Sequence, residues 1–175
     1  MKKIISILAM ITILVVSACA LTGCGKKKKL QTVTFKDKDT KVSVNLSFEE
    51  GANYTLSENK EEFRTSREDA ILKGDNFNIA IQMDEFFGSE TINDLKENDK
   101  ERKDYKEVTY NGVQGYSYYY SSYNRYEVVL PATEKVYVTF HIYTQDFGGK
   151  EDDAKTTFDS SVVQDILNTV SFSAE

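Results

Sequence analysis

The sequence predicts an α+β fold, a mainly antiparallel sheet flanked by helices. Several segments alternate apolar and polar residues, which is the pattern of a strand with one buried face. Val42, Val44, Leu46 and Phe48, for example, fall on one side of such a segment, with polar residues between them. Helical spacing occurs in two places, in the middle of the chain and at its end. Strands that follow one another with few helices between them favour antiparallel pairing.

The strands are expected to form hairpins, because turn residues separate the alternating segments. Asp37-Lys38-Asp39 and Gly74-Asp75-Asn76 supply the turns of the first two hairpins. The expected strands cover residues 31–36, 42–48, 69–73, 77–86, 107–110, 113–121, 125–130 and 135–144.

Two helices are predicted. The first runs from about residue 90 or 91 to 103, and its narrow apolar edge of Ile92 and Leu95 places it on the surface. The second covers residues 151–169, and its acidic start suits the positive end of the helix dipole. Its apolar residues recur every four positions, which predicts a core helix: Ala154, Phe158, Val162, Ile166 and Val170.

The first 23 residues have the build of an export signal. Lys2 and Lys3 precede an apolar stretch, and Leu21-Thr22-Gly23-Cys24 resembles the lipobox of bacterial lipoproteins. The resemblance implies cleavage before Cys24 and a thioether-linked lipid on that cysteine. Two alternatives stay open. The first is cleavage before Cys19, because Val16-Ser17-Ala18-Cys19 fits a looser form of the lipobox pattern. The second is an uncleaved membrane span formed by the apolar stretch, which is short for a segment that must cross a bilayer.

Residues 24–30 are expected to form the lipidated cysteine and a lysine tether, and residues 31–175 a single α+β domain. Because Cys19 leaves with the signal and Cys24 carries lipid, we expect no disulfide. The protein is expected on the extracytoplasmic face of a cell membrane. Its richness in lysine, asparagine and tyrosine favours a Gram-positive surface.

The domain is strongly acidic. The chain has 22 basic and 28 acidic residues, and removing the six lysines before residue 30 leaves 16 against 28, a net charge of −12. Binding to phosphate backbones needs a basic surface. We therefore expect no nucleic-acid partner.

Four stretches of the chain share a pattern of buried positions with a known fold. Residues 76–82, 111–116, 136–143 and 163–172 resemble the bacterial lipoprotein branch of the Mog1/PsbP-like fold. The resemblance implies an α/β/α sandwich that acts as a binding or accessory module and seldom as an enzyme. Members of the fold serve unrelated partners, so no residue role is carried over.

No motif assigns catalytic residues, a metal or a cofactor. His141 is the only histidine and shares a strand face with Tyr137, Thr139 and Tyr143. We expect it to be half-buried and hydrogen-bonded to a neighbouring strand. A zinc site would need carboxylates almost alone, and the acidic turns lack the spacing of a calcium-binding loop. A glycosidase that uses two carboxylates also stays open as a function, but the sequence singles out no pair of acidic residues for it.

The unusual feature of the composition is tyrosine, since six of the eleven tyrosines lie between positions 116 and 126. Strand alternation places Tyr116, Tyr118 and Tyr120 on one face and Tyr119 on the other. Cross-strand packing is the first interpretation. The second is an exposed ledge of Tyr116, Tyr118 and Tyr120 that binds a partner, because tyrosine offers a rigid area and a hydroxyl.

Two functions from different classes follow. The first is a membrane-anchored binding or accessory module whose partner is an envelope protein, a glycan or a small molecule. The alternative is a cell-envelope hydrolase that uses carboxylates or His141. A flat tyrosine-bearing sheet face would favour the module, whereas a pocket lined by converging carboxylates or His141 would favour the hydrolase.

Overall fold

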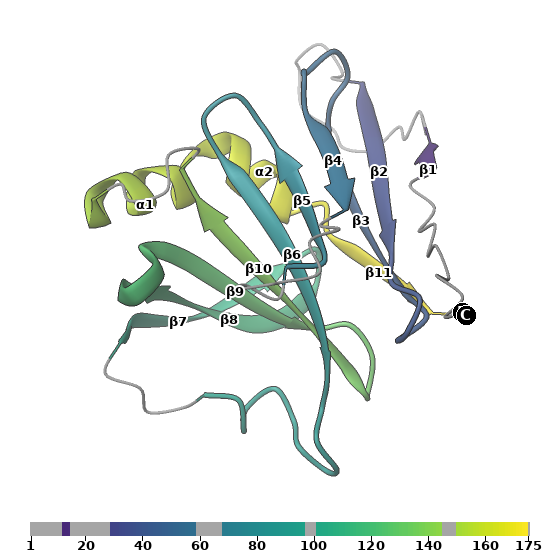
Figure 1. Ribbon diagram of the computed structural model, residues 1–175, viewed down its shortest axis with the longest axis vertical. Coiled ribbons are helices and arrows are strands. Elements are labelled where there is room, and N and C mark those ends of the chain that lie inside the picture. Colours follow the sequence, from purple (N-terminus) through teal and green to yellow (C-terminus); the bar gives the residue numbers. More distant parts are fainter. Residues whose placement is uncertain (1–11, 15–28, 59–67, 97–100, 145–149, 175) are drawn as a thin grey trace, which may run out of the picture.

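The computed structural model describes residues 12–14, 29–58, 68–96, 101–144 and 150–174 (Figure 1). The described chain forms two sheets and two α-helices, and every strand pair in it is antiparallel. The smaller sheet has the order β1-β2-β3-β11, and the larger has the order β4-β5-β6-β10-β9-β8-β7. The prediction of a mainly antiparallel sheet is therefore confirmed.

Both N-terminal hairpins are confirmed, and so are the strands that follow them. The sequence patterns missed β1, β4 and β11. β1 falls within the stretch that was expected to be an export signal, and its backbone pairs with β2. β4 and β11 are short and largely solvent-accessible and so show little alternation. The strands are β1 (Thr12–Leu14), β2 (Leu30–Lys36), β3 (Val42–Glu49), β4 (Thr55–Glu58), β5 (Ala70–Lys73), β6 (Asn78–Glu85), β7 (Arg102–Tyr110), β8 (Val113–Tyr120), β9 (Arg125–Pro131), β10 (Val136–Tyr143) and β11 (Ser171–Ala174). A short 3-10 turn, η1 (Ser121–Tyr123), joins β8 to β9.

The C-terminal helix is broken in two, where one continuous helix was expected. It consists of α1 (Glu151–Phe158) and α2 (Ser161–Leu167). Ser160 lies between them in an extended conformation, and its hydroxyl accepts a hydrogen bond from the Val163 amide. A serine at this position caps the start of a new helix and competes with continuation of the old one.

The helix expected from about residue 90 to 103 is wrong. Residues 91–96 form turns, residues 97–100 lie outside the described chain, and Arg102 already belongs to β7. Side chains take up the local backbone donors: Asp94 accepts from the Thr91 amide at 2.8 Å, and Glu90 accepts from the Phe87 amide at 2.9 Å. Such bonds satisfy the backbone donors without a helix. A helix here would also bury little apolar surface, because its apolar edge is narrow.

The two faces of the larger sheet differ sharply. One face is apolar and shares a single hydrophobic core with the helices and the smaller sheet, and within that core α1 contacts β9 and β10 while α2 contacts β3 (Figure 1). The contribution of the larger sheet to this core includes Ile79, Ile81, Val128, Leu130, Phe140 and Ile142. The opposite face carries polar and aromatic side chains.

The features that concern the membrane lie mostly outside the described residues. Cys24, the competing Cys19 and lysines 26–28 are not among them, so the anchor stays a prediction. Lys29 is described, and its ammonium lies 3.8 Å from the Glu50 carboxylate. No helix in the described ranges is both long enough and apolar enough to cross a bilayer.

Candidate ligand-binding site

The polar face of the larger sheet gathers side chains from four neighbouring strands. In the register of β8, β9 and β10, Tyr118 lies opposite Glu127, and Glu127 lies opposite His141. One step along the strands, Tyr116, Val129 and Thr139 form the next row. Because neighbouring strands are about 4.8 Å apart, each row brings its side chains into contact range.

The tight turn between β7 and β8 fixes this register. Asn111 and Gly112 both have positive φ angles, 46° and 81°. Two consecutive residues of this conformation make the two-residue turn whose twist matches a β-hairpin, and Asn-Gly is the sequence that adopts it most readily. The Asn111 side chain also donates to the carbonyl of Val170, at 2.9 Å. The turn therefore positions β8, with its tyrosines, relative to the C-terminal segment.

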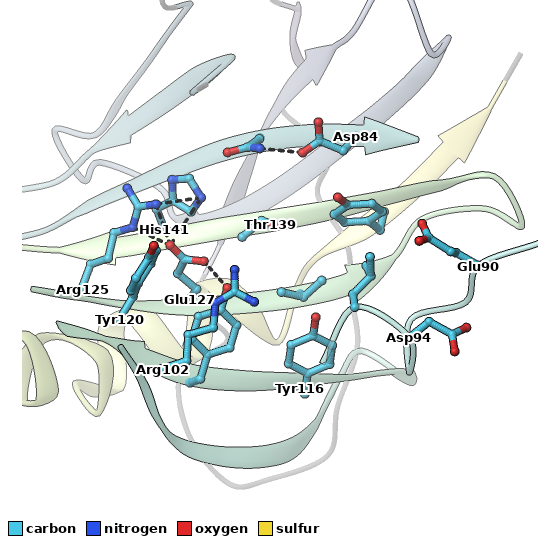
Figure 2. A pocket seen from close by; sticks show the side chains of 15 residues that line it. Asp84, Glu90, Asp94, Arg102, Tyr116, Tyr120, Arg125, Glu127, Thr139 and His141 are labelled. Carbon is cyan, nitrogen blue, oxygen red and sulfur yellow. Dashed lines mark hydrogen bonds and ion pairs between the residues drawn. The ribbon is translucent and has the colours of Figure 1, made fainter. Parts of the chain in front are cut away.

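A cavity of about 290 Å³ opens on this face (Figure 2). Its floor is formed by β6, β8, β9 and β10, and its other walls come from β7 and from the turns that follow β6. The residues that line it are Gln82, Asp84, Glu90, Asp94, Leu95, Arg102, Tyr116, Tyr118, Tyr120, Arg125, Glu127, Val129, Tyr137, Thr139 and His141.

The inner end of the cavity is a buried network of charged side chains (Figure 2). Arg125 donates from Nε to Oε1 of Glu127 at 2.6 Å, and its Nη2 lies at the same distance from that oxygen. The Arg125 Nη1 atom lies 3.6 Å from Oε1 of Glu68. His141 sits between the two pairs, with Nδ1 3.4 Å from Oε1 of Glu68 and Nε2 3.4 Å from Nη2 of Arg125.

The protonation states of this network follow from its geometry. Burial alone would raise the pKa of Glu127, but His141, Arg125 and the Tyr118 hydroxyl outweigh burial and hold the pKa below its ordinary value. Tyr118 donates its hydroxyl hydrogen to Oε2 of Glu127, and burial together with this carboxylate raises the pKa of the phenol. Glu127 is therefore ionised and Tyr118 protonated at neutral pH.

Two hydroxyl groups in the row of Tyr116, Val129 and Thr139 open onto the cavity without a partner in the described chain. Tyr116 is 2% exposed and Thr139 is 6% exposed, and both line the cavity. Neither side-chain hydroxyl makes a hydrogen bond to any part of the chain that the structure describes. The two residues flank Val129, which supplies an apolar centre to the cavity floor. Both hydroxyls are therefore available to a molecule that enters the cavity.

The outer end of the cavity is acidic. Figure 2 shows Asp84, Glu90 and Asp94 around this end, away from the inner network. Asp84 accepts a hydrogen bond from the Gln82 amide. Hydrogen bonds from the Thr91 hydroxyl and amide hold the pKa of Asp94 below its ordinary value.

The prediction of an exposed tyrosine ledge is wrong for two of its three members. The register does place Tyr116, Tyr118 and Tyr120 on one face, as expected. Tyr116 and Tyr118 are nevertheless buried, and Tyr120 is half-buried. The rings pack along the strand with centroids 6.0 and 6.5 Å apart, and the Arg102 guanidinium covers Tyr118 at 5.0 Å. The tyrosines are thus cavity walls, and whether they contact a ligand stays a prediction.

The expectations for His141 are met in part. It shares its face with Tyr137, Thr139 and Tyr143, as predicted, but it is fully buried where half-burial was expected. The sequence patterns missed Glu68, Arg125 and Glu127. One signal was present for the last two, because charged residues on one face of the otherwise apolar strand 125–130 require partners if that face is buried.

Metal ligands do not converge in the described chain, where no group of three or more His, Cys, Asp or Glu side chains is placed to hold an ion. Comparisons with protein-family models, curated proteins and solved structures find no match to this chain.

Proposed function

We propose that the protein is a membrane-anchored extracytoplasmic lipoprotein whose domain binds a small polar ligand in the cavity of the larger sheet. The observation that carries the proposal is a pair of hydroxyls, on the buried residues Tyr116 and Thr139, that open onto the cavity without a partner in the described chain. A polar ligand can replace cavity water as the hydrogen-bond partner of each hydroxyl, and such an exchanged hydrogen bond contributes roughly 0.5–1.5 kcal/mol. A volume of about 290 Å³ is at the lower end for small-molecule pockets.

Binding, rather than catalysis, fits the state of the inner network. A general base needs a free lone pair and a pKa near the working pH. Both oxygens of Glu127 are already engaged, one by Arg125 and one by Tyr118, and the pKa of its carboxyl is lowered. The network therefore stabilises a rigid wall of the cavity.

We expect a substitution that fills the cavity to abolish ligand binding. In Val129→Phe the ring extends from the centre of the floor into the space between Tyr116 and Thr139. Ligand-observed NMR with hexoses, N-acetylhexosamines, amino acids, amines and nucleosides would detect binding to the intact protein. At least one class should bind with a Kd below about 1 mM and lose its signal with Val129→Phe.

The matched control is Val162→Phe, the same substitution on α2, at a side chain that is 41% exposed. It should leave every binding signal in place. A set of signals that are the same for the parent and for Val129→Phe would show that the cavity is not the binding site.

The lipid anchor is a separate prediction. The lipobox-like Leu21-Thr22-Gly23-Cys24 is the basis for it. Cys24→Ser should move the protein from the membrane fraction to the soluble fraction, or leave it unprocessed, because the thiol is the only group that can form the thioether. Mass spectrometry of the N-terminal peptide is the measurement. A chain that begins at Cys19, or one that retains the residues before Cys24, would refute the assignment.

We also propose that the fold belongs with the Mog1/PsbP-like sandwiches. One support is the antiparallel sheet together with two helices near the C-terminal end of the chain. The other is the four stretches of sequence that resemble the pattern of that fold. An experimental structure would test this proposal through its strand order.

A hydrolase is the second candidate, and one specific observation favours it: Glu127 and His141 line a cavity together with Asp84, Glu90 and Asp94. This is the pocket that was expected of an enzyme. It ranks second because the described cavity adds no activated nucleophile to these groups. Chromogenic glycosides and esters discriminate the two, since turnover that disappears in Glu127→Gln would establish the enzyme.

A further inference from the structure

We infer that the cavity ligand carries a primary ammonium group, which lies between the acidic outer end and the hydroxyls of Tyr116 and Thr139. The inference rests on the proposed function and adds the chemical class of the ligand. Three properties of the cavity support it: the distribution of charge, the tyrosine rings and the two unpartnered hydroxyls.

The charge distribution favours a cation. Glu90 and Asp94 each use one carboxylate oxygen for a turn hydrogen bond, at Oε2 and Oδ2 respectively. Their other oxygens have no hydrogen bond or ion pair in the ranges that the structure describes. No lysine is among the described residues that line the cavity. Two negative groups at the outer end thus face the space without a cation of their own.

The two arginines of the inner end have different surroundings. Arg125 lies against the carboxylates of Glu127 and Glu68, at 2.6 and 3.6 Å. Arg102 stacks over the rings of Tyr118 and Tyr120, with its guanidinium carbon 5.0 and 5.6 Å from their centroids. An anionic ligand would have to compete with Glu68 and Glu127 for Arg125, whereas a cationic ligand meets the acidic end directly.

The tyrosine rings already accept cations. The Lys96 ammonium lies 5.6 Å from the centroid of Tyr116, and the guanidinium carbon of Arg125 lies 4.7 Å from that of Tyr123. The negative electrostatic face of an aromatic ring attracts ammonium groups within about 6 Å. The wall formed by Tyr116 and Tyr118 is therefore one at which cations are stabilised, with Lys96 and Arg102 already in contact with these two rings.

The two hydroxyls that open onto the cavity select among cations. Each hydroxyl oxygen can accept a hydrogen bond, and a primary ammonium has three donors and no acceptor. Thr139 is more than nine-tenths buried, and Figure 2 shows its side chain at the cavity between the inner network and the acidic end. A primary ammonium can donate to such hydroxyls and to a carboxylate together, which a quaternary ammonium cannot do.

Isothermal titration calorimetry with matched amine and neutral probes tests the inference. Cadaverine is compared with its neutral diol analogue, and glucosamine with glucose, at mildly acidic pH so that both amines are charged. We expect at least one amine to bind at least about tenfold more tightly than its neutral counterpart, and to weaken as NaCl is raised. Selective binding of cadaverine would identify the ligand as an alkylamine, and selective binding of glucosamine would identify it as an amino sugar.

Variants locate the effect. Glu90→Gln combined with Asp94→Asn should weaken amine binding by about tenfold or more, because both negative charges are lost while the turn hydrogen bonds keep an acceptor. The control combines Glu151→Gln with Asp165→Asn, which removes the same charge from exposed positions on the helices. This control should bind the amine as the parent does.

The outcomes distinguish a failure of the ammonium inference from a failure of the proposed function. Neutral compounds that bind as tightly as the amines and are lost with Val129→Phe would overturn the ammonium inference and leave the proposed function intact. If the double charge variant and its control weaken amine binding equally, the effect is one of net charge and the inference is wrong. An absence of any binding by amines and neutral compounds alike would overturn both.

Discussion

Replacement of Ile166 with aspartate is expected to unfold the domain. Ile166 lies on α2 with 1% of its side chain exposed, within the core that joins the helices to both sheets. A carboxylate at this position would be buried without a cation or hydrogen-bond donor, which costs several kcal/mol. Domains of this size are stable by only about 5–15 kcal/mol. Circular dichroism should show a large fall in Tm, or a chain already unfolded at room temperature.

The control for this experiment is Val162→Asp, one turn earlier on the same helix. Val162 is exposed, so the same new charge stays in water and should shift the Tm by only a few degrees. Equal melting of the two variants would mean that α2 does not pack on the sheets as described.

The sequence patterns predicted the strands well because burial on one side of a sheet is a local property of the sequence. In β3 the alternation of Val42, Val44, Leu46 and Phe48 with polar residues matches the observed burial at every position. The failures occurred where local bonds competed with periodicity. Ser160 interrupts the expected C-terminal helix, and the carboxylates of Glu90 and Asp94 replace the expected surface helix with turns.

The candidate site was predicted only in part, for a different reason. Strand alternation placed Tyr116, Tyr118 and Tyr120 on one face, but burial of that face depends on β7 and on the turns after β6. Glu68 reaches His141 across 73 positions of the sequence, so no local pattern could bring them together. Glu68 lies just before β5, and the strand order places β6 between β5 and β10, so this pair appears only when the arrangement of the sheet is known.

The cavity and the buried network depend on one another. The network fills the inner end with groups that satisfy one another, so the space that remains lies over Val129 and toward the acidic end. A ligand in that space would meet a wall whose charges are already balanced. Ligand specificity would then come from the hydroxyls and the outer carboxylates, while the network holds the strands in position.

Arg125→Met is expected to destabilise the domain strongly. It leaves the buried carboxylates of Glu68 and Glu127 next to each other without their shared cation. Loss of one partner from a buried ion pair costs about 3–5 kcal/mol, because the remaining charge is uncompensated. Chemical denaturation at neutral pH measures the difference. Lys155→Met, which breaks the exposed pair with Asp159, should leave the stability close to that of the parent.

The effect of Arg125→Met should also depend on pH. The pKa of Glu127 lies below its ordinary value of 4.5 in the folded protein, so its contribution to stability is present above that pH and is lost as the pH falls below it. Without Arg125 the pKa of this carboxyl rises, and protonation relieves the variant while it destabilises the parent. The difference in unfolding free energy between the two proteins should therefore begin to narrow above pH 4.5, as the carboxyl of the variant is protonated, and narrow further below pH 4.5 as the parent loses its stabilisation. A difference that stays constant from neutral pH into this acidic range would show that Arg125 stabilises the domain through packing and not through charge.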